Sequence, residues 1–150
     1  MFKRILYLFI LSSLFLSGNA FSYQFRDYSW GTPKSEIKEK LISQGKEVTD
    51  ENNVLYYKDK IFDEDCQVCF IFTLGSQALC VITLTWNDTA VGAKLKEELA
   101  KKYGEPVKIN PYSQEYTWTG HLEEKCDDLD LNYNRGDTRL QYYGEDCYRA

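Results

Sequence analysis

The chain has 150 residues, of which 18 are Lys or Arg and 23 are Asp or Glu, so its formal net charge is −5. This acidic balance argues against nucleic acid and anionic lipid as partners, because both attract a positive surface. The length is sufficient for one domain with its own hydrophobic core.

The first twenty residues, MFKRILYLFILSSLFLSGNA, have the three parts of a secretory signal peptide. Lys3 and Arg4 supply the positive start, residues 5–16 form an apolar run, and residues 18–20 are small or polar. The run is shorter than the roughly 20 residues that cross a bilayer, which disfavours the alternative of an uncleaved membrane anchor. We therefore expect cleavage after Ala20 and a soluble periplasmic or secreted protein, residues 21–150, without stable membrane insertion.

Two segments have helical periodicity. The first extends from Pro33 to about Gln44, with Thr32 as the expected N-cap and Gly45 as the stop. The second extends from about Thr89 to Tyr103, where apolar residues recur every four positions. Asp88 or Thr89 is expected to cap the second helix, and a glycine and a proline follow its end.

Alternating runs rich in β-forming residues predict six strands, two of which are joined to the next by glycine-containing hairpin turns. The turns are expected at Gly75-Ser76 and at residues 134–137. The expected strands are Val54–Lys58, Cys66–Leu74, Ala78–Trp86, Tyr112–Trp118, Leu129–Asn134 and Thr138–Tyr143.

The two halves of the chain resemble each other. Ile37–Leu41 matches Leu95–Leu99 in the helices, and Gly75 matches Gly136 after corresponding strands. We therefore predict an α+β fold of two α-β-β-β repeats, about residues 30–86 and 88–145, with an antiparallel sheet and the helices packed on one face. The alternative is that two simple binary patterns agree by chance.

Strand alternation predicts which side chains meet the helices. Val68, Phe70 and Phe72, and in the second half Leu129, Leu131 and Tyr133, are expected on the helix side. The opposite face of the first half is then also apolar, with Cys69, Ile71, Cys80, Ile82, Leu84 and Trp86. Such a face needs a cover, either the N-terminal stretch around Phe25, Tyr28 and Trp30 or a partner.

All five cysteines follow the signal peptide, and an exported protein favours their pairing. Cys126 with Cys147 and Cys69 with Cys80 are the candidate disulfides, which leaves Cys66 as the odd cysteine. Cys66-x-x-Cys69 has the spacing of a redox or zinc motif, but it lies in an extended pattern and has no second motif beside it. A structural role for this pair is therefore favoured.

No pattern in the sequence selects a catalytic residue, a metal ligand or a cofactor site. His121 is the single histidine and is expected in a loop. The acidic residues leave open a hydrolase that uses carboxylates. Surplus aromatic residues suggest a binding surface, although they are also ordinary strand formers; the candidates are Trp86, Tyr112, Tyr116, Trp118 and Tyr143.

Two helix-end patterns, Trp30-Gly31-Thr32-Pro33-x-x-Glu36-Ile37 and Tyr103-Gly104-x-Pro106, carry a family resemblance. With the tandem units and the signal peptide, the chain resembles the β-lactamase-inhibitor-protein-like superfamily, which includes the SmpA/OmlA outer-membrane assembly lipoproteins. Asn19 stands where those lipoproteins have their acylated cysteine.

The resemblance implies a protein-binding module and not an enzyme. We therefore expect an exported protein of the inhibitor, immunity or envelope-assembly type that recognises another protein through its sheet surface. The alternatives are an envelope hydrolase and a structural accessory of an envelope complex.

Overall fold

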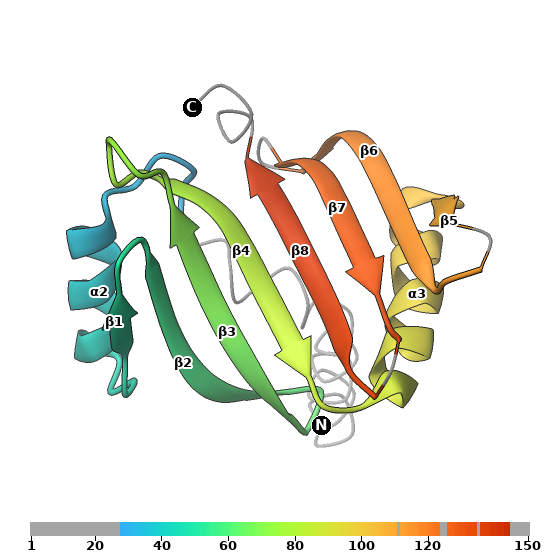
Figure 1. Cartoon of the computed structure of the whole chain (residues 1–150), viewed down its shortest axis with the longest axis horizontal. Helices are drawn as coiled ribbons and strands as arrows, with labels where there is room; N and C mark the ends of the chain where they lie inside the picture. Colours follow the sequence, from blue (N-terminus) through green and yellow to red (C-terminus); the bar gives the residue numbers. More distant parts are fainter. Residues whose placement is uncertain (1–27, 111, 124–125, 135, 145–150) are drawn as a thin grey trace, which may run out of the picture.

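The computed structural model describes residues 28–110, 112–123, 126–134 and 136–144 (Figure 1). The predicted signal peptide and Phe25 lie outside these residues. The described elements, in chain order, are α2 (Lys34–Ser43), β1 (Thr49–Glu51), β2 (Val54–Ile61), β3 (Glu64–Phe72), β4 (Leu79–Trp86), α3 (Thr89–Tyr103), β5 (Val107–Asn110), β6 (Glu115–Glu123), β7 (Cys126–Asn132) and β8 (Thr138–Gly144).

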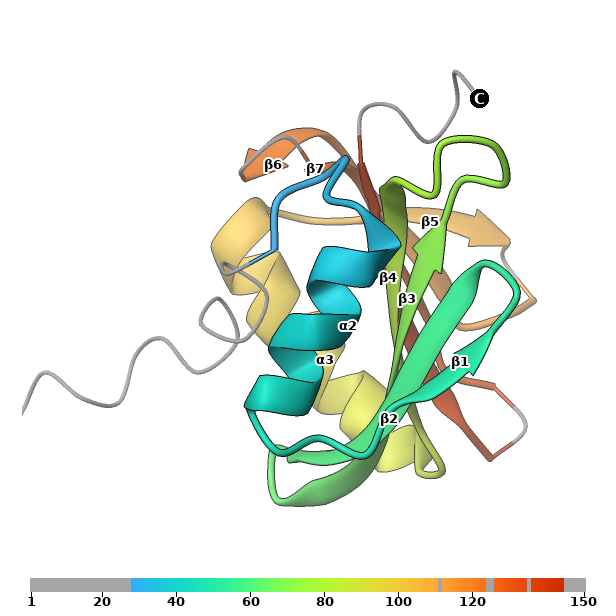
Figure 2. The same ribbon diagram turned by 90° about the vertical axis from the view of Figure 1, so that its left-hand side faces the viewer.

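The strands form one antiparallel sheet in the order β1-β2-β3-β4-β8-β7-β6-β5. Each half of the sheet consists of four consecutive strands, and the halves meet where β4 pairs with β8 along residues 81–86 and 138–143 (Figure 1). Both helices lie on the same side of the sheet (Figure 2). The opposite side, here called the open face, is not covered by any described helix.

The predicted α+β fold of two α-β-β-β repeats is wrong. The described structure is mostly β. Strands make up 48% and helices 23%, and all the described strands belong to one sheet. Each helix is followed by four strands and not three, because β1 and β5 are additional short strands at the two edges. β1 has the sequence Thr-Asp-Glu and no apolar residue. β5 alternates Val107 and Ile109 with polar residues over only four positions, which is at the short limit of a recognisable strand pattern.

The helix predictions agree closely with the structure. α3 has the expected bounds, and Asp88 caps it by accepting a hydrogen bond from the Ala90 amide at 2.8 Å. Thr32 does not cap α2, because its hydroxyl donates to the Ser29 carbonyl at 2.7 Å. Pro33 occupies the N-cap position instead, without a side-chain hydrogen bond to the helix.

The core lies between the helices and the sheet. The predicted inward residues of both halves are buried there, and Tyr133 packs against them. The face assignment of β4 is wrong, because Ile82 pairs with Phe70, Leu84 with Val68 and Trp86 with Cys66. Directly paired residues point to the same side of a sheet, so Ile82, Leu84 and Trp86 belong to the helix side.

The described part of the N-terminal stretch, from Tyr28 onward, packs on the helix side and does not cover the open face. The Tyr28 ring meets the buried Phe70 ring edge-on, with centroids 5.0 Å apart. Trp30 packs against the same core and lies directly over Gly144. A Cβ atom at position 144 would be 2.6 Å from the indole, so the end of β8 has room only for glycine there.

Candidate functional site

A row of apolar side chains crosses the centre of the open face. The pairing register aligns Val54 of β2, Ile71 of β3, Val81 of β4 and Tyr143 of β8. These four residues are here called the apolar strip. All but Val81 are partly exposed. The strip is therefore an aliphatic and aromatic surface, and its removal from water by a covering molecule would be favourable.

An acidic residue stands at each end of the apolar strip. Glu51 of β1 pairs with Val54, and Asp128 of β7 pairs with Tyr143. Burial and the carboxylate of Asp130 raise the pKa of the Tyr143 phenol above its usual value. The phenol therefore stays neutral and the negative charge in this part of the face belongs to the carboxylates.

Three of the aromatic residues predicted for a binding surface are buried. Trp86, Tyr116 and Trp118 are 0%, 6% and 3% exposed, and all lie in the core. Both indole N–H groups have hydrogen-bond partners within the protein. Trp86 donates to the Ile61 carbonyl at 3.3 Å, and Trp118 donates to the Gly104 carbonyl at 2.8 Å. Their assignment to a binding surface is wrong. Alternation along a strand shows which residues share a face of the sheet, but it does not show which face the helices cover.

The other two predicted aromatic residues lie at the surface. Tyr112 is 97% exposed and belongs to the turn between β5 and β6, not to a strand as expected. Tyr143 is half-buried in the apolar strip. The structure therefore places Tyr112 on a turn at the edge of the sheet and Tyr143 near the centre of the open face.

Cys66 and Cys69 both carry free thiols. Cys66 faces the core and Cys69 the open face, because residues three apart in a strand point to opposite sides. Burial raises the pKa of the Cys66 thiol to about 12 and also raises that of Cys69. A reactive pair needs a lowered thiol pKa, so this geometry gives the motif no redox chemistry.

The predicted bond between Cys69 and Cys80 is not formed. Cys69 pairs with Thr83, three residues along β4 from Cys80, a separation of roughly 10 Å along the strand. A disulfide needs a Cα separation below about 7 Å. The side chain of Cys126 and all of Cys147 lie outside the described residues, so that candidate pair stays a prediction.

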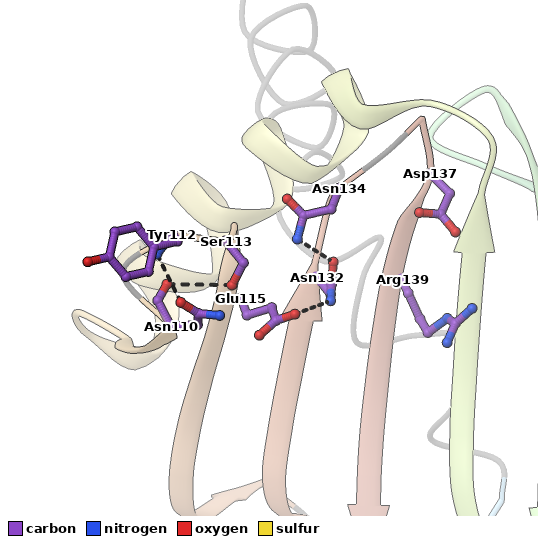
Figure 3. A pocket seen from close by; sticks show the side chains of 8 residues that line it. All are labelled: Asn110, Tyr112, Ser113, Glu115, Asn132, Asn134, Asp137 and Arg139. Carbon is purple, nitrogen blue, oxygen red and sulfur yellow. Dashed lines mark hydrogen bonds between the residues drawn. The ribbon is translucent and has the colours of Figure 1, made fainter.

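A pocket of about 680 Å³ lies at the end of the open face formed by β6, β7 and β8 (Figure 3). Its floor is a second row of paired residues, Glu115 of β6, Asn132 of β7 and Arg139 of β8. Asn110 at the end of β5, the turn before β6 and the turn between β7 and β8 supply the rest of the lining. We call this cavity the end pocket.

The side chains around the end pocket are held by a chain of hydrogen bonds (Figure 3). The Asn132 amide donates to Glu115 at 3.0 Å, and the Asn134 amide donates to Asn132 at 3.1 Å. Asn134 in turn accepts from the Gln114 backbone amide at 3.2 Å, and Asn110 accepts from the Tyr112 amide at 2.9 Å. These bonds fix the orientation of three asparagine side chains.

Sequence reasoning did not find the end pocket. Asn134 and Asp137 were visible only as parts of a hairpin turn, and nothing marked Asn132 or Arg139. The row exists because the register aligns three strands, a relation between distant segments that local patterns do not contain.

The other predicted chemistry is only partly within the described structure. The side chain of His121 lies outside it, and the described residues contain no group of three His, Cys, Asp or Glu side chains arranged to hold a metal ion. For the hydrolase alternative, Glu115 and Asp137 are two carboxylates that line one pocket.

Within the described part of the chain, neither helix has the length and apolar character that crossing a membrane requires. Compared with known proteins, the chain matches no family model, no curated protein and no solved structure.

Proposed function

We propose that this chain binds another protein on the open face of its sheet. The observation that carries the proposal is the row that runs from Glu51 through the apolar strip to Asp128. The partner is a surface with apolar side chains at its centre and basic side chains on both sides.

The apolar strip supplies the attraction in this proposal. Partly exposed Val and Ile side chains gain about 25 cal/mol for each Å² of apolar surface removed from water. Tyr143 adds an amphipathic ring of the kind that dominates binding energy at protein interfaces. Its half-buried position limits the side-chain entropy lost on binding.

The acidic ends of the row supply selectivity. Glu51 and Asp128 favour partners that present Lys or Arg opposite them and disfavour acidic surfaces. The row spans five inter-strand spacings, about 24 Å. This width accommodates a standard interface of about 800 Å² on each partner.

The proposal is tested by affinity capture with the full chain from the exported proteins of the organism that encodes it. The variant is Ile71→Glu, which places a charge in the centre of the apolar strip. The matched control is Ile42→Glu, because Ile42 is 55% exposed on α2, on the other side of the sheet.

We expect a partner that the native chain and Ile42→Glu retain and that Ile71→Glu loses. With that partner purified, Asp128→Lys should slow association at low salt, and the difference should shrink as salt is added. Capture of the same proteins by all three chains would show that the apolar strip is not the binding surface.

A further inference from the structure

The two edges of the sheet differ in how they are protected. β1 and β5 lie at its opposite ends (Figure 1), and the outer side of an edge strand carries backbone N–H and C=O groups with which another strand can pair. β1 has the sequence Thr-Asp-Glu, and its Asp50 forms ion pairs with Lys34 and Lys38 of α2. A short, charged strand is a common protection of a sheet edge against foreign strands.

β5 has no comparable protection. Apart from the pairing with β6, no backbone hydrogen bond within the described residues involves Val107, Lys108 or Ile109. Val107 and Ile109 are 63% and 57% exposed, and the fully exposed Tyr112 follows in the next turn. Exposed apolar side chains therefore gather beside a backbone edge that is free to pair.

The pairing of β5 with β6 defines the two faces of the edge. Val107 pairs with Thr117, and Lys108 pairs with the buried Tyr116. Since paired residues share a face, Val107 points to the open-face side and Lys108 to the helix side. Ile109 lies at a register shift and has no partner on β6. A strand added outside β5 would place alternate residues beside Val107 and the residues between them beside Lys108.

The helix side of this edge carries two lysines. The ammonium groups of Lys96 on α3 and of Lys108 lie over the Tyr116 ring, 4.5 Å and 5.9 Å from its centroid. Neither forms an ion pair with another described residue. The acidic residue nearest to Lys108 in the sequence, Glu105, precedes the paired part of the strand. An acidic side chain on an added strand would therefore gain a cross-strand partner.

We propose that the outer side of β5 binds an extended segment of another protein as an additional strand. The segment alternates apolar residues, on the open-face side, with Asp or Glu on the helix side. Its backbone hydrogen bonds supply affinity, and the alternating side chains supply specificity. The β5 strand of a second copy fits less well, because it brings another Lys108 where the acid is favoured. This inference is independent of the proposal for the open face, since it uses the backbone and side chains of an edge strand.

The probe is the end-blocked peptide Ser-Val-Glu-Val-Glu-Val-Ser, titrated into the full chain and followed by NMR. We expect it to shift the backbone amide signals of residues 107–109. Val107→Lys should weaken binding about tenfold through loss of apolar contact. Lys108→Glu should also weaken it about tenfold, and should favour the peptide in which Lys replaces Glu.

Peptides methylated on alternate backbone nitrogens separate strand pairing from contact through side chains alone. One methylation pattern should abolish binding, because its methyl groups point at β5 and remove the donors, while the other pattern should retain it. Leu74→Lys is the matched control, because Leu74 is 83% exposed in the turn between β3 and β4, and it should bind the peptide as the native chain does.

Ile71→Glu should also leave peptide binding unchanged, so failure at the apolar strip and failure at β5 are distinguishable. The proposal is overturned if no amide of residues 107–109 shifts at about 1 mM peptide, a concentration at which weak sites begin to fill. It is also overturned if the Glu and Lys peptides bind the native chain alike, or if both methylated peptides bind. A dimer of the native chain that Val107→Lys dissociates would show that a second copy occupies the edge instead.

Discussion

Gly92 of α3 packs tightly against Tyr133, the residue that directly follows β7. A Cβ atom at this position would lie 2.2 Å from the Cβ of Tyr133. The Tyr133 ring stacks on Tyr116, with centroids 5.9 Å apart. Because the conflict involves an atom next to the backbone, rotation of the tyrosine does not relieve it. Glycine therefore allows the helix to lie this close to the segment that follows β7.

This contact predicts that Gly92→Ala destabilises the protein. On an unobstructed helix the same change would stabilise by up to about 1 kcal/mol, but overpacking should reverse the sign and cost about 1–3 kcal/mol. Urea unfolding measures the difference. Gly75→Ala is the control, since no atom lies within 4 Å of a Cβ there, and its effect should stay within about 0.5 kcal/mol. A stabilised Gly92→Ala protein would contradict the described packing.

The two free thiols predict a marked difference in reactivity. Cys66 is 2% exposed and burial raises its pKa to about 12, whereas Cys69 is partly exposed on the open face. Alkylation requires the thiolate and access. Iodoacetamide at pH 8 should therefore label Cys69 slowly and Cys66 only after denaturation. Peptide mass spectrometry locates the label, and rapid labelling of native Cys66 would contradict this environment.

The raised pKa of Cys66 also links the thiol to stability at alkaline pH. The folded state holds the thiol proton more tightly than the unfolded state, where the pKa is about 8.5. The stabilisation is therefore complete below pH 8.5 and is lost as the pH rises toward 12. Comparison of the native chain with Cys66→Ala isolates this contribution from that of other groups.

At the scale of elements, the two helices begin in different ways. Asp88 accepts the Ala90 amide proton, while Thr32 makes no hydrogen bond to α2. Asp88→Ala should therefore destabilise the protein by about 1 kcal/mol, and Thr32→Ala should cost less. Thermal unfolding followed by circular dichroism measures both. Equal losses of unfolding free energy in the two variants would show that the Asp88 cap does not stabilise α3 as expected.

The elements that sequence reasoning found are those with a strong local signal. α3 combines apolar residues every four positions with an acidic cap and a terminal glycine, and its bounds were predicted correctly. The strands on either side of the turn expected at residues 134–137 do pair with each other, with Leu131 opposite Leu140.

The candidate sites depend on relations that local patterns do not carry. The faces of β4 were assigned wrongly. Cys69 and Ile71 of β3 do face outward as predicted, but the β4 residues that pair with Phe70 and Val68 face inward with them. The apolar strip and the end pocket both follow from register across several strands. Sequence reasoning anticipated a binding surface on the sheet, but three of its five aromatic residues are core residues.

At the scale of the whole molecule, the two halves of the sheet share one core. Leu84 of β4 pairs with Leu140 of β8, and both are fully buried. Thr138, also fully buried, donates from its hydroxyl to the Asp88 carbonyl at 2.6 Å and so joins β8 to the segment before α3. Separation of the halves would expose this seam to water, so neither half should be stable without the other.

This arrangement predicts a single cooperative unfolding transition. Trp86 reports on the first half and Trp118 on the second, while Trp30 lies over Gly144 and must be removed from both probes. The double variants Trp30→Phe/Trp118→Phe and Trp30→Phe/Trp86→Phe each leave one indole, in the first and in the second half. In each variant, the urea transition followed by indole fluorescence should coincide with the transition followed by circular dichroism. Leu84→Ala should cost about 2–5 kcal/mol and shift both probes together, because the leucine contacts the core of both halves. If the Trp118 signal persisted after the Trp86 signal was lost, the halves would be separate units and the open face would be a junction between two domains.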